Sequence, residues 1–131
     1  MFSYDLNFLS DPKLVYFTDA RNPILDYKNI QKFYKIIDLV KLHPSDSKKT
    51  YNDLKLQYIE NYDAALESKY VMMRPSTVIF EAAISGCLCF CLQTNNLESY
   101  LYNFLYPTLS AIDHSINLVS DSAQLINALK K

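Results

Sequence analysis

The sequence predicts an α/β domain in which helices cover both faces of an open, doubly wound parallel sheet of about five strands. Two observations predict this fold. Short apolar runs recur along the chain, and most are followed by a segment with apolar residues at helical spacing. Strands that alternate with helices in this way form βαβ units, whose strands run parallel. The chain has 131 residues, 50% of them hydrophobic, so it can bury both faces of such a sheet.

Two strands and one helix are expected in the first part of the domain. Residues 14–17 (LVYF) form a buried strand. Asn22-Pro23 marks a turn, and apolar side chains at helical spacing predict a helix over residues 27–37. Residues 39–42 form the next strand, which stops at His43-Pro44 because proline cannot continue a central ladder. These elements make up a first βαβ unit.

The middle of the chain adds two helices and one strand. A helix with its apolar residues on one face is expected over residues 50–62, and residues 70–73 form a buried strand. Ser76 or Thr77 then caps another helix. Gly86, the only glycine in the chain, ends that helix at the C′ position, where a left-handed residue is favoured.

The last part of the chain repeats the alternation. Residues 87–92 and 116–119 are expected to be strands, and residues 97–105 to be helical. A final helix begins at Asp121 or Ser122. All three cysteines lie on the first of these strands, at Cys87, Cys89 and Cys91. Alternate residues of a strand share a face, so the three thiols are expected on one side of the sheet as small buried hydrophobes.

Composition excludes several classes of protein. A formal net charge of -1 gives no electrostatic basis for nucleic-acid binding. A single glycine rules out a glycine-rich phosphate loop, and the cysteines and acidic residues lack the spacing of a metal site. We expect no metal and no cofactor. The sequence has no signal-peptide pattern and no apolar stretch long enough to span a bilayer, which predicts a cytoplasmic protein.

Polar side chains follow several of the predicted strands at the point where each strand ends. The segments are Thr18-Asp19, His43-Pro44, Arg74-Pro75-Ser76-Thr77 and Gln93-Thr94-Asn95. Ligands of open α/β sheets bind outside the carboxyl ends of the strands. The sequence therefore predicts a ligand site at this edge, with the second and third segments at adjacent strand ends.

The residues of the second and third segments suit a phosphate group. The His43 imidazole can donate a hydrogen bond to one phosphate oxygen. Ser76, Thr77 and the first amides of the following helix can bind another oxygen, and Arg74 can add charge-assisted bonds. Glu81, about one turn into that helix, can accept bonds from ribose hydroxyls. The expected nucleotide- and phosphate-binding residues are His43, Pro44, Arg74, Ser76, Thr77 and Glu81.

Each of these residues also has a purely structural interpretation. Ser76 and Thr77 are then ordinary helix caps, and Glu81 is either solvated or the ion-pair partner of Arg74. His43 simply ends a strand. Asp19, at the end of the first strand, is either catalytic or a turn residue.

Two of the motifs together resemble a known family. The run Lys41-Leu42-His43-Pro44, followed further along by residues 74–82 (RPSTVIFEA) and Gly86, is similar to the C-terminal, donor-binding half of GT-B-fold glycosyltransferases. The most similar group is that of bacterial sialyltransferases and capsule polysaccharide transferases. Those enzymes use a His-Pro motif and a later Ser/Thr motif to bind the cytidine nucleotide of the donor. The resemblance covers residues 14–131.

The resemblance implies a division of the chain and a role for each motif. Residues 1–12 would be an N-terminal arm or the remnant of a linker, and residues 13–131 a single Rossmann-like, nucleotide-sugar-binding domain that forms half of a GT-B fold. His43 and Ser76-Thr77 would bind the donor phosphate, with Glu81 near the ribose. The catalytic base of the family belongs to the N-terminal half, so no catalytic residue is assigned, and a second chain would supply the acceptor domain.

The implied function is binding of a nucleotide-activated sugar, either CMP-sialic acid-like or a UDP-sugar, for bacterial surface polysaccharide synthesis. The chain would be a fragment or subunit of a transferase. Three alternatives stay open: a polyol-phosphate transferase, an epimerase-like domain, and a non-catalytic α/β interaction module. Peripheral association with the inner face of the membrane is also left open.

Overall fold

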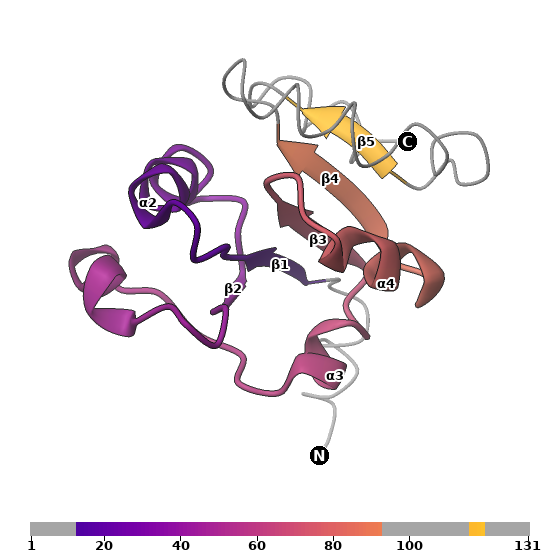
Figure 1. Ribbon diagram of the computed structural model, residues 1–131, viewed down its shortest axis with the longest axis horizontal. Helices are drawn as coiled ribbons and strands as arrows, with labels where there is room; N and C mark the ends of the chain where they lie inside the picture. The colour runs from indigo at the N-terminus through magenta and orange to yellow at the C-terminus, as the bar shows by residue number, and fades with distance from the viewer. Residues whose placement is uncertain (1–12, 93–115, 120–131) are drawn as a thin grey trace.

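A parallel sheet of five strands forms the centre of the computed structural model, which describes residues 13–92 and 116–119. The strands lie in the order β2-β1-β3-β4-β5, and all neighbours are parallel (Figure 1). Their bounds are Leu14–Phe17 for β1, Leu39–Lys41 for β2, Tyr70–Met73 for β3, Leu88–Leu92 for β4 and Ile116–Val119 for β5. The predicted open, parallel α/β sheet is confirmed.

Helices pack on both faces of the sheet. Among the described residues these are α2 (Pro23–Lys32), the 3₁₀ helix η1 (Lys48–Leu54), α3 (Tyr62–Ala65) and α4 (Val78–Ile84). α2 and η1 contribute to one buried cluster, whereas α3 and α4 contribute to the cluster on the other face (Figure 1). β1 is buried at all four of its positions, and its side chains alternate between the two clusters. Burial on both faces explains why the strand is a continuous apolar run.

The predicted helix over residues 50–62 is wrong. η1 ends at Lys55, which has a left-handed backbone with φ 53. The chain is then extended, and Tyr58 forms a parallel bridge with Val40 of β2. The amide of Val40 donates to the Gln57 carbonyl at 2.9 Å, and the amide of Ile59 donates to the Val40 carbonyl at 3.0 Å. Val40 is fully buried, so its amide and carbonyl groups cannot be solvated by water. They therefore need these two hydrogen-bond partners.

The segment around Tyr58 lies beside β2 and adds a sixth, single-bridge member to the edge of the sheet. The side chains of Tyr58 and Ile59 pack against opposite clusters, as the period of a strand requires. Counted with this segment, the strands follow the 3-2-1-4-5-6 order of dinucleotide-binding folds. The domain is therefore Rossmann-like. Its strand order reverses between β1 and β3, which is where ligands of such folds bind.

Local sequence signals explain where α2 begins and where α4 ends. α2 starts earlier than predicted, because the Asn22 side chain accepts a hydrogen bond from the Leu25 amide at 3.1 Å and Pro23 fits the first helical position. α4 ends as predicted, with Gly86 at φ 98. The amides of Gly86 and Cys87 donate to the carbonyls of Ala83 and Ala82, which is a Schellman motif.

The cysteines lie as the strand period predicts. Cys87, Cys89 and Cys91 are buried, and all three belong to the same cluster as α3 and α4. Several other predictions fall outside the described residues: the arm at 1–12, the polar segment at 93–95, the helix at 97–105 and the final helix.

Candidate functional site

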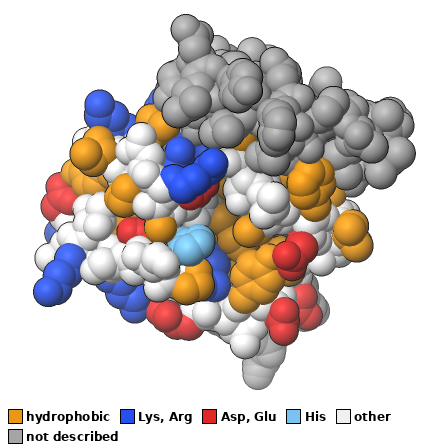
Figure 2. Space-filling model, in the orientation of Figure 1, with side chains coloured by type: hydrophobic (Ala, Val, Ile, Leu, Met, Phe, Trp, Pro, Cys, Tyr) orange, Lys and Arg blue, Asp and Glu red, His pale blue; other side chains and the backbone are white. Residues whose placement is uncertain are grey.

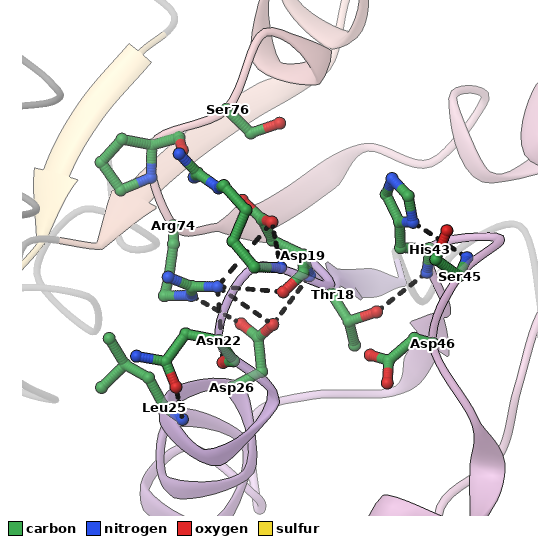
Figure 3. A network of polar contacts seen from close by, with 12 residues as sticks. Thr18, Asp19, Asn22, Leu25, Asp26, His43, Ser45, Asp46, Arg74 and Ser76 are labelled. Carbon is green, nitrogen blue, oxygen red and sulfur yellow. Dashed lines mark hydrogen bonds and ion pairs between the residues drawn. The ribbon is translucent and has the colours of Figure 1, made fainter.

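The carboxyl ends of β1, β2 and β3 form one edge of the sheet, and the predicted polar loops lie there. β1 lies between β2 and β3, so the loops that contain His43 and Ser76 flank the end of β1 and do not follow neighbouring strands as expected. The β1–α2 loop occupies the position between them (Figure 3). Residues of that loop are therefore part of the candidate site.

Arg74 is held in a buried ion pair at this edge. The residue is 3% exposed, and its Nε donates to Oδ1 of the fully buried Asp26 at 2.9 Å. Its Nη2 donates to the Asp19 carbonyl at 3.0 Å (Figure 3). The alternative in which Glu81 is the ion-pair partner of Arg74 is wrong, because the partner is Asp26. Arg74 thus ties the end of β3 to the β1–α2 loop and to α2.

Asp26 is the centre of this network. Its carboxylate also accepts a hydrogen bond from the Tyr16 hydroxyl at 2.7 Å and one from the Asp19 amide at 2.7 Å. Burial raises the pKa of Asp26, and the hydrogen bond and charge of Arg74 oppose that rise. Burial, together with the Asp26 charge, raises the pKa of Tyr16 well above its ordinary value. Tyr16 is therefore a neutral donor, and the network is a rigid support for the loop above it.

Arg21 is a half-exposed cation in the β1–α2 loop, and the sequence did not single it out. Its side chain is 49% exposed and forms an ion pair with Asp19. Nε donates to Asp19 Oδ2 at 2.7 Å, and Nη2 donates to the Pro75 carbonyl at 2.6 Å. Arg21 therefore joins the β1–α2 loop to the loop after β3. The only signal in the sequence was an acidic residue two positions before it.

His43 is exposed, and its loop is tied to the end of β1. The His43 amide donates to Oγ1 of Thr18 at 2.9 Å. The amide of Ser45 donates to Nδ1 of the imidazole at 3.0 Å, which leaves the proton of a neutral ring on Nε2. Figure 2 shows a histidine side chain, coloured pale blue, at the surface of this face of the molecule. His43 can therefore donate a hydrogen bond from Nε2 to a ligand.

A polar cleft of about 400 Å³ opens beside His43. The residues that matter for its chemistry are His43, Pro44, Asp46, Lys48, Tyr58 and Glu60. Lys48 and Glu60 form an ion pair of 2.9 Å across it, and the Lys48 ammonium lies 4.9 Å from the centre of the Tyr58 ring. The bridge between Tyr58 and β2 thus supplies one wall of the cleft.

The remaining predicted residues lie around the start of α4. The Ser76 hydroxyl accepts a hydrogen bond from the Val78 amide at 3.3 Å, whereas the exposed Thr77 makes no side-chain capping bond. Glu81 is exposed, and its Oε2 accepts a hydrogen bond from the Tyr62 hydroxyl at 2.9 Å. Burial and the Glu81 hydrogen bond raise the pKa of Tyr62 to about 12. Ser76 is thus the residue whose side chain supports the helix start.

Residues 13–92 and 116–119 contain neither a cluster of metal ligands nor a helix that could cross a membrane. No group of His, Cys, Asp and Glu side chains there could hold a metal ion. None of the helices in that part of the chain is both long and apolar enough to cross a membrane.

Asp19 is expected to contribute to the loss of stability of the protein at acidic pH. Burial raises the pKa of Asp19, but hydrogen bonds from Arg21 and the charges of Arg21 and Arg74 outweigh this and hold the pKa below the ordinary value of an aspartate. A carboxyl group with a lowered folded-state pKa stabilises the protein above its unfolded pKa, and that contribution is lost as the pH falls through the folded value. Asp19→Asn is therefore expected to reduce the fall in the urea midpoint between about pH 5 and about pH 2.

The control for this experiment is Asp63→Asn, which removes an exposed carboxylate from the first turn of α3. That variant is expected to change the acid profile less than Asp19→Asn does. An unchanged fall in midpoint for Asp19→Asn would show that Asp19 does not contribute to stability through its ion pairs.

No protein-family model matches the sequence. No curated protein matches it either. Among solved structures, the UDP-N-acetylglucosamine 3-dehydrogenase GnnA from Acidithiobacillus ferrooxidans aligns with 69% of this chain at 17% identity and a TM-score of 0.46. The chain spans 33% of the length of that protein.

Proposed function

We propose that the chain is the donor-binding half of a GT-B-type glycosyltransferase and that the nucleotide-activated sugar binds at the carboxyl edge of the sheet. The observation that carries the proposal is the arrangement of three side chains around the end of β1. His43 lies on one side, Arg21 is at the centre, and Ser76 lies on the other side. Imidazole, guanidinium and hydroxyl groups can all donate hydrogen bonds to a phosphate group, and here they surround the point between β1 and β3 where the strand order reverses.

Each residue of the proposed site has a distinct role. His43 donates from Nε2 to a phosphate oxygen, and Pro44 restricts the loop that carries it. Ser76 and Thr77 offer hydroxyl groups, and Glu81 accepts bonds from the ribose. Arg21 takes the charge-pairing role first expected of Arg74. The contacts of Arg21 with described residues use Nε and Nη2, so its Nη1 hydrogens are available to a ligand.

Arg74 acts in this proposal as a positioning residue. Its buried guanidinium holds the Asp19 and Asn22 carbonyls at 3.0 and 3.5 Å and so fixes the loop that carries Arg21. A preorganised loop loses little conformational entropy when a ligand binds.

The chemical role of this half is to stabilise the leaving group. When the bond between the sugar and the phosphate oxygen breaks, negative charge develops on the nucleotide phosphate. Donors fixed around that phosphate favour the charged product over the bound donor. The acceptor and the catalytic base would come from a second domain or chain.

Nucleotide binding measured by calorimetry tests the proposal. Wild-type protein is titrated with CMP, CDP, UDP and GDP. Selective binding is expected, and His43→Ala and Ser76→Ala are each expected to weaken it about tenfold, as for loss of one charge-assisted or buried hydrogen bond. Preference for cytidine nucleotides favours a sialyltransferase-like or polyol-phosphate donor, and preference for UDP favours a UDP-sugar.

The matched control is Ser85→Ala, which removes an exposed hydroxyl at the opposite end of α4. Its affinity should equal that of the wild type. Wild-type affinity in both His43→Ala and Ser76→Ala would contradict the site. A folded protein that binds none of the nucleotides would favour the non-catalytic interaction module.

A further inference from the structure

A second cavity, of about 720 Å³, lies where α2 and η1 both end. α2 leads through a turn into the start of β2, so this cavity is at the amino edge of the sheet, away from the proposed nucleotide site. Its walls include the apolar or aromatic side chains of Phe33, Tyr34, Ile36 and Leu54. A cavity of this size with mostly apolar walls fits a small molecule.

Two backbone features shape this cavity. Phe33 is the C-cap of α2 and is only 1% exposed, so its ring is part of the core beneath the cavity. Lys55 ends η1 in a left-handed conformation, which turns the chain away. The Tyr34 hydroxyl donates to the Lys55 carbonyl at 3.3 Å and thereby links the two helix ends.

The charges around the cavity have mainly one sign. The lining residues include three exposed lysines, Lys32, Lys35 and Lys55, and one acidic residue, Asp53. The Asp53 carboxylate accepts a hydrogen bond from the Tyr27 hydroxyl at 2.6 Å. The whole chain has a net charge of -1, so the positive charge here is a local excess. An apolar cavity with a cationic rim complements a molecule that is apolar at one end and anionic at the other.

We propose that this cavity binds an alkyl carboxylate of medium length. The alkyl chain would lie against Ile36 and Leu54, and the carboxylate would lie between the ammonium groups of Lys35 and Lys55. The proposal does not depend on the nucleotide site, because the two sites are at opposite edges of the sheet.

Calorimetric titration with decanoate at neutral pH tests this proposal. Decanoate is expected to bind, butyrate to show no measurable binding because it lacks apolar surface, and decanol to bind more weakly because it lacks the charge. Lys35→Ala and Lys55→Asn should each reduce affinity for decanoate about two- to fivefold. Asparagine is chosen at position 55 because it tolerates the left-handed backbone.

The control variant is Lys49→Ala, which removes an exposed lysine at the other end of η1 and should leave the affinity unchanged. Thermal unfolding confirms that each variant is folded. Absence of decanoate binding to the folded wild type would overturn the proposal. Equal affinities in the wild type, Lys35→Ala and Lys55→Asn would also overturn it, because binding would then not involve this rim.

Discussion

Arg74→Met is expected to lower the free energy of unfolding by about 3–5 kcal/mol, because it leaves a buried carboxylate without its cation. Asp26 is fully buried, and its Oδ1 receives the Arg74 Nε hydrogen at 2.9 Å. The methionine fills much of the volume but cannot neutralise or solvate the charge. Urea unfolding followed by circular dichroism gives the change in midpoint and, with an unchanged slope, the change in stability.

Two further variants separate the buried charge from other effects of the substitution. The double variant Arg74→Met/Asp26→Leu is expected to regain part of the loss, since no unpaired charge remains. Recovery will be incomplete, because the Tyr16 hydroxyl and the Asp19 amide also lose their acceptor. Arg21→Met, at the exposed ion pair, should change stability by no more than about 1 kcal/mol. A loss of similar size for Arg74→Met and Arg21→Met would contradict a structural role for the buried pair.

The buried network marks the limit of what the sequence predicted about the site. Asp26 lies in a segment dense in charged residues, and nothing local distinguishes it from a solvated helix residue. Its partner Arg74 is 48 residues away, so the pairing depends on β1 and β3 being neighbours in the sheet. The spacing of apolar residues and the composition do not show which strands are neighbours in the sheet. For the same reason, His43 and Ser76 were expected at adjacent strand ends, although β1 lies between them.

The features that depend only on residues close together in the sequence were predicted correctly. Gly86 ends α4 because the left-handed position favours glycine, and the cysteines share a face because strand side chains alternate. The failure at residues 50–62 has a related cause. The spacing of Leu54 and Tyr58 fits a helix, but Lys55 between them has a left-handed backbone that ends the helix. The edge of β2 that faces away from β1 then offers backbone hydrogen-bond partners to an extended chain.

Ile59→Pro tests whether that extended segment is an integral part of the sheet. Proline has no amide hydrogen, so the bond from Ile59 to the buried Val40 carbonyl at 3.0 Å is lost. We expect the free energy of unfolding to fall by about 2–4 kcal/mol, from the unsatisfied carbonyl and the lost packing of a half-buried side chain. The urea midpoint measures this loss.

Ile59→Ala is the matched control, because it removes most of the side chain and keeps the amide hydrogen. Ile59→Pro should be less stable than Ile59→Ala by about 1–3 kcal/mol, which is the cost of the unsatisfied Val40 carbonyl. Equal stabilities would mean that the hydrogen bond from the Ile59 amide to the Val40 carbonyl contributes nothing to stability. The cleft beside His43 has Tyr58 and Glu60 in its walls, so its shape depends on the same bridge. Ile59 itself lines the cleft, so both folded variants are expected to bind nucleotide more weakly than the wild type, and Ile59→Pro more weakly than Ile59→Ala.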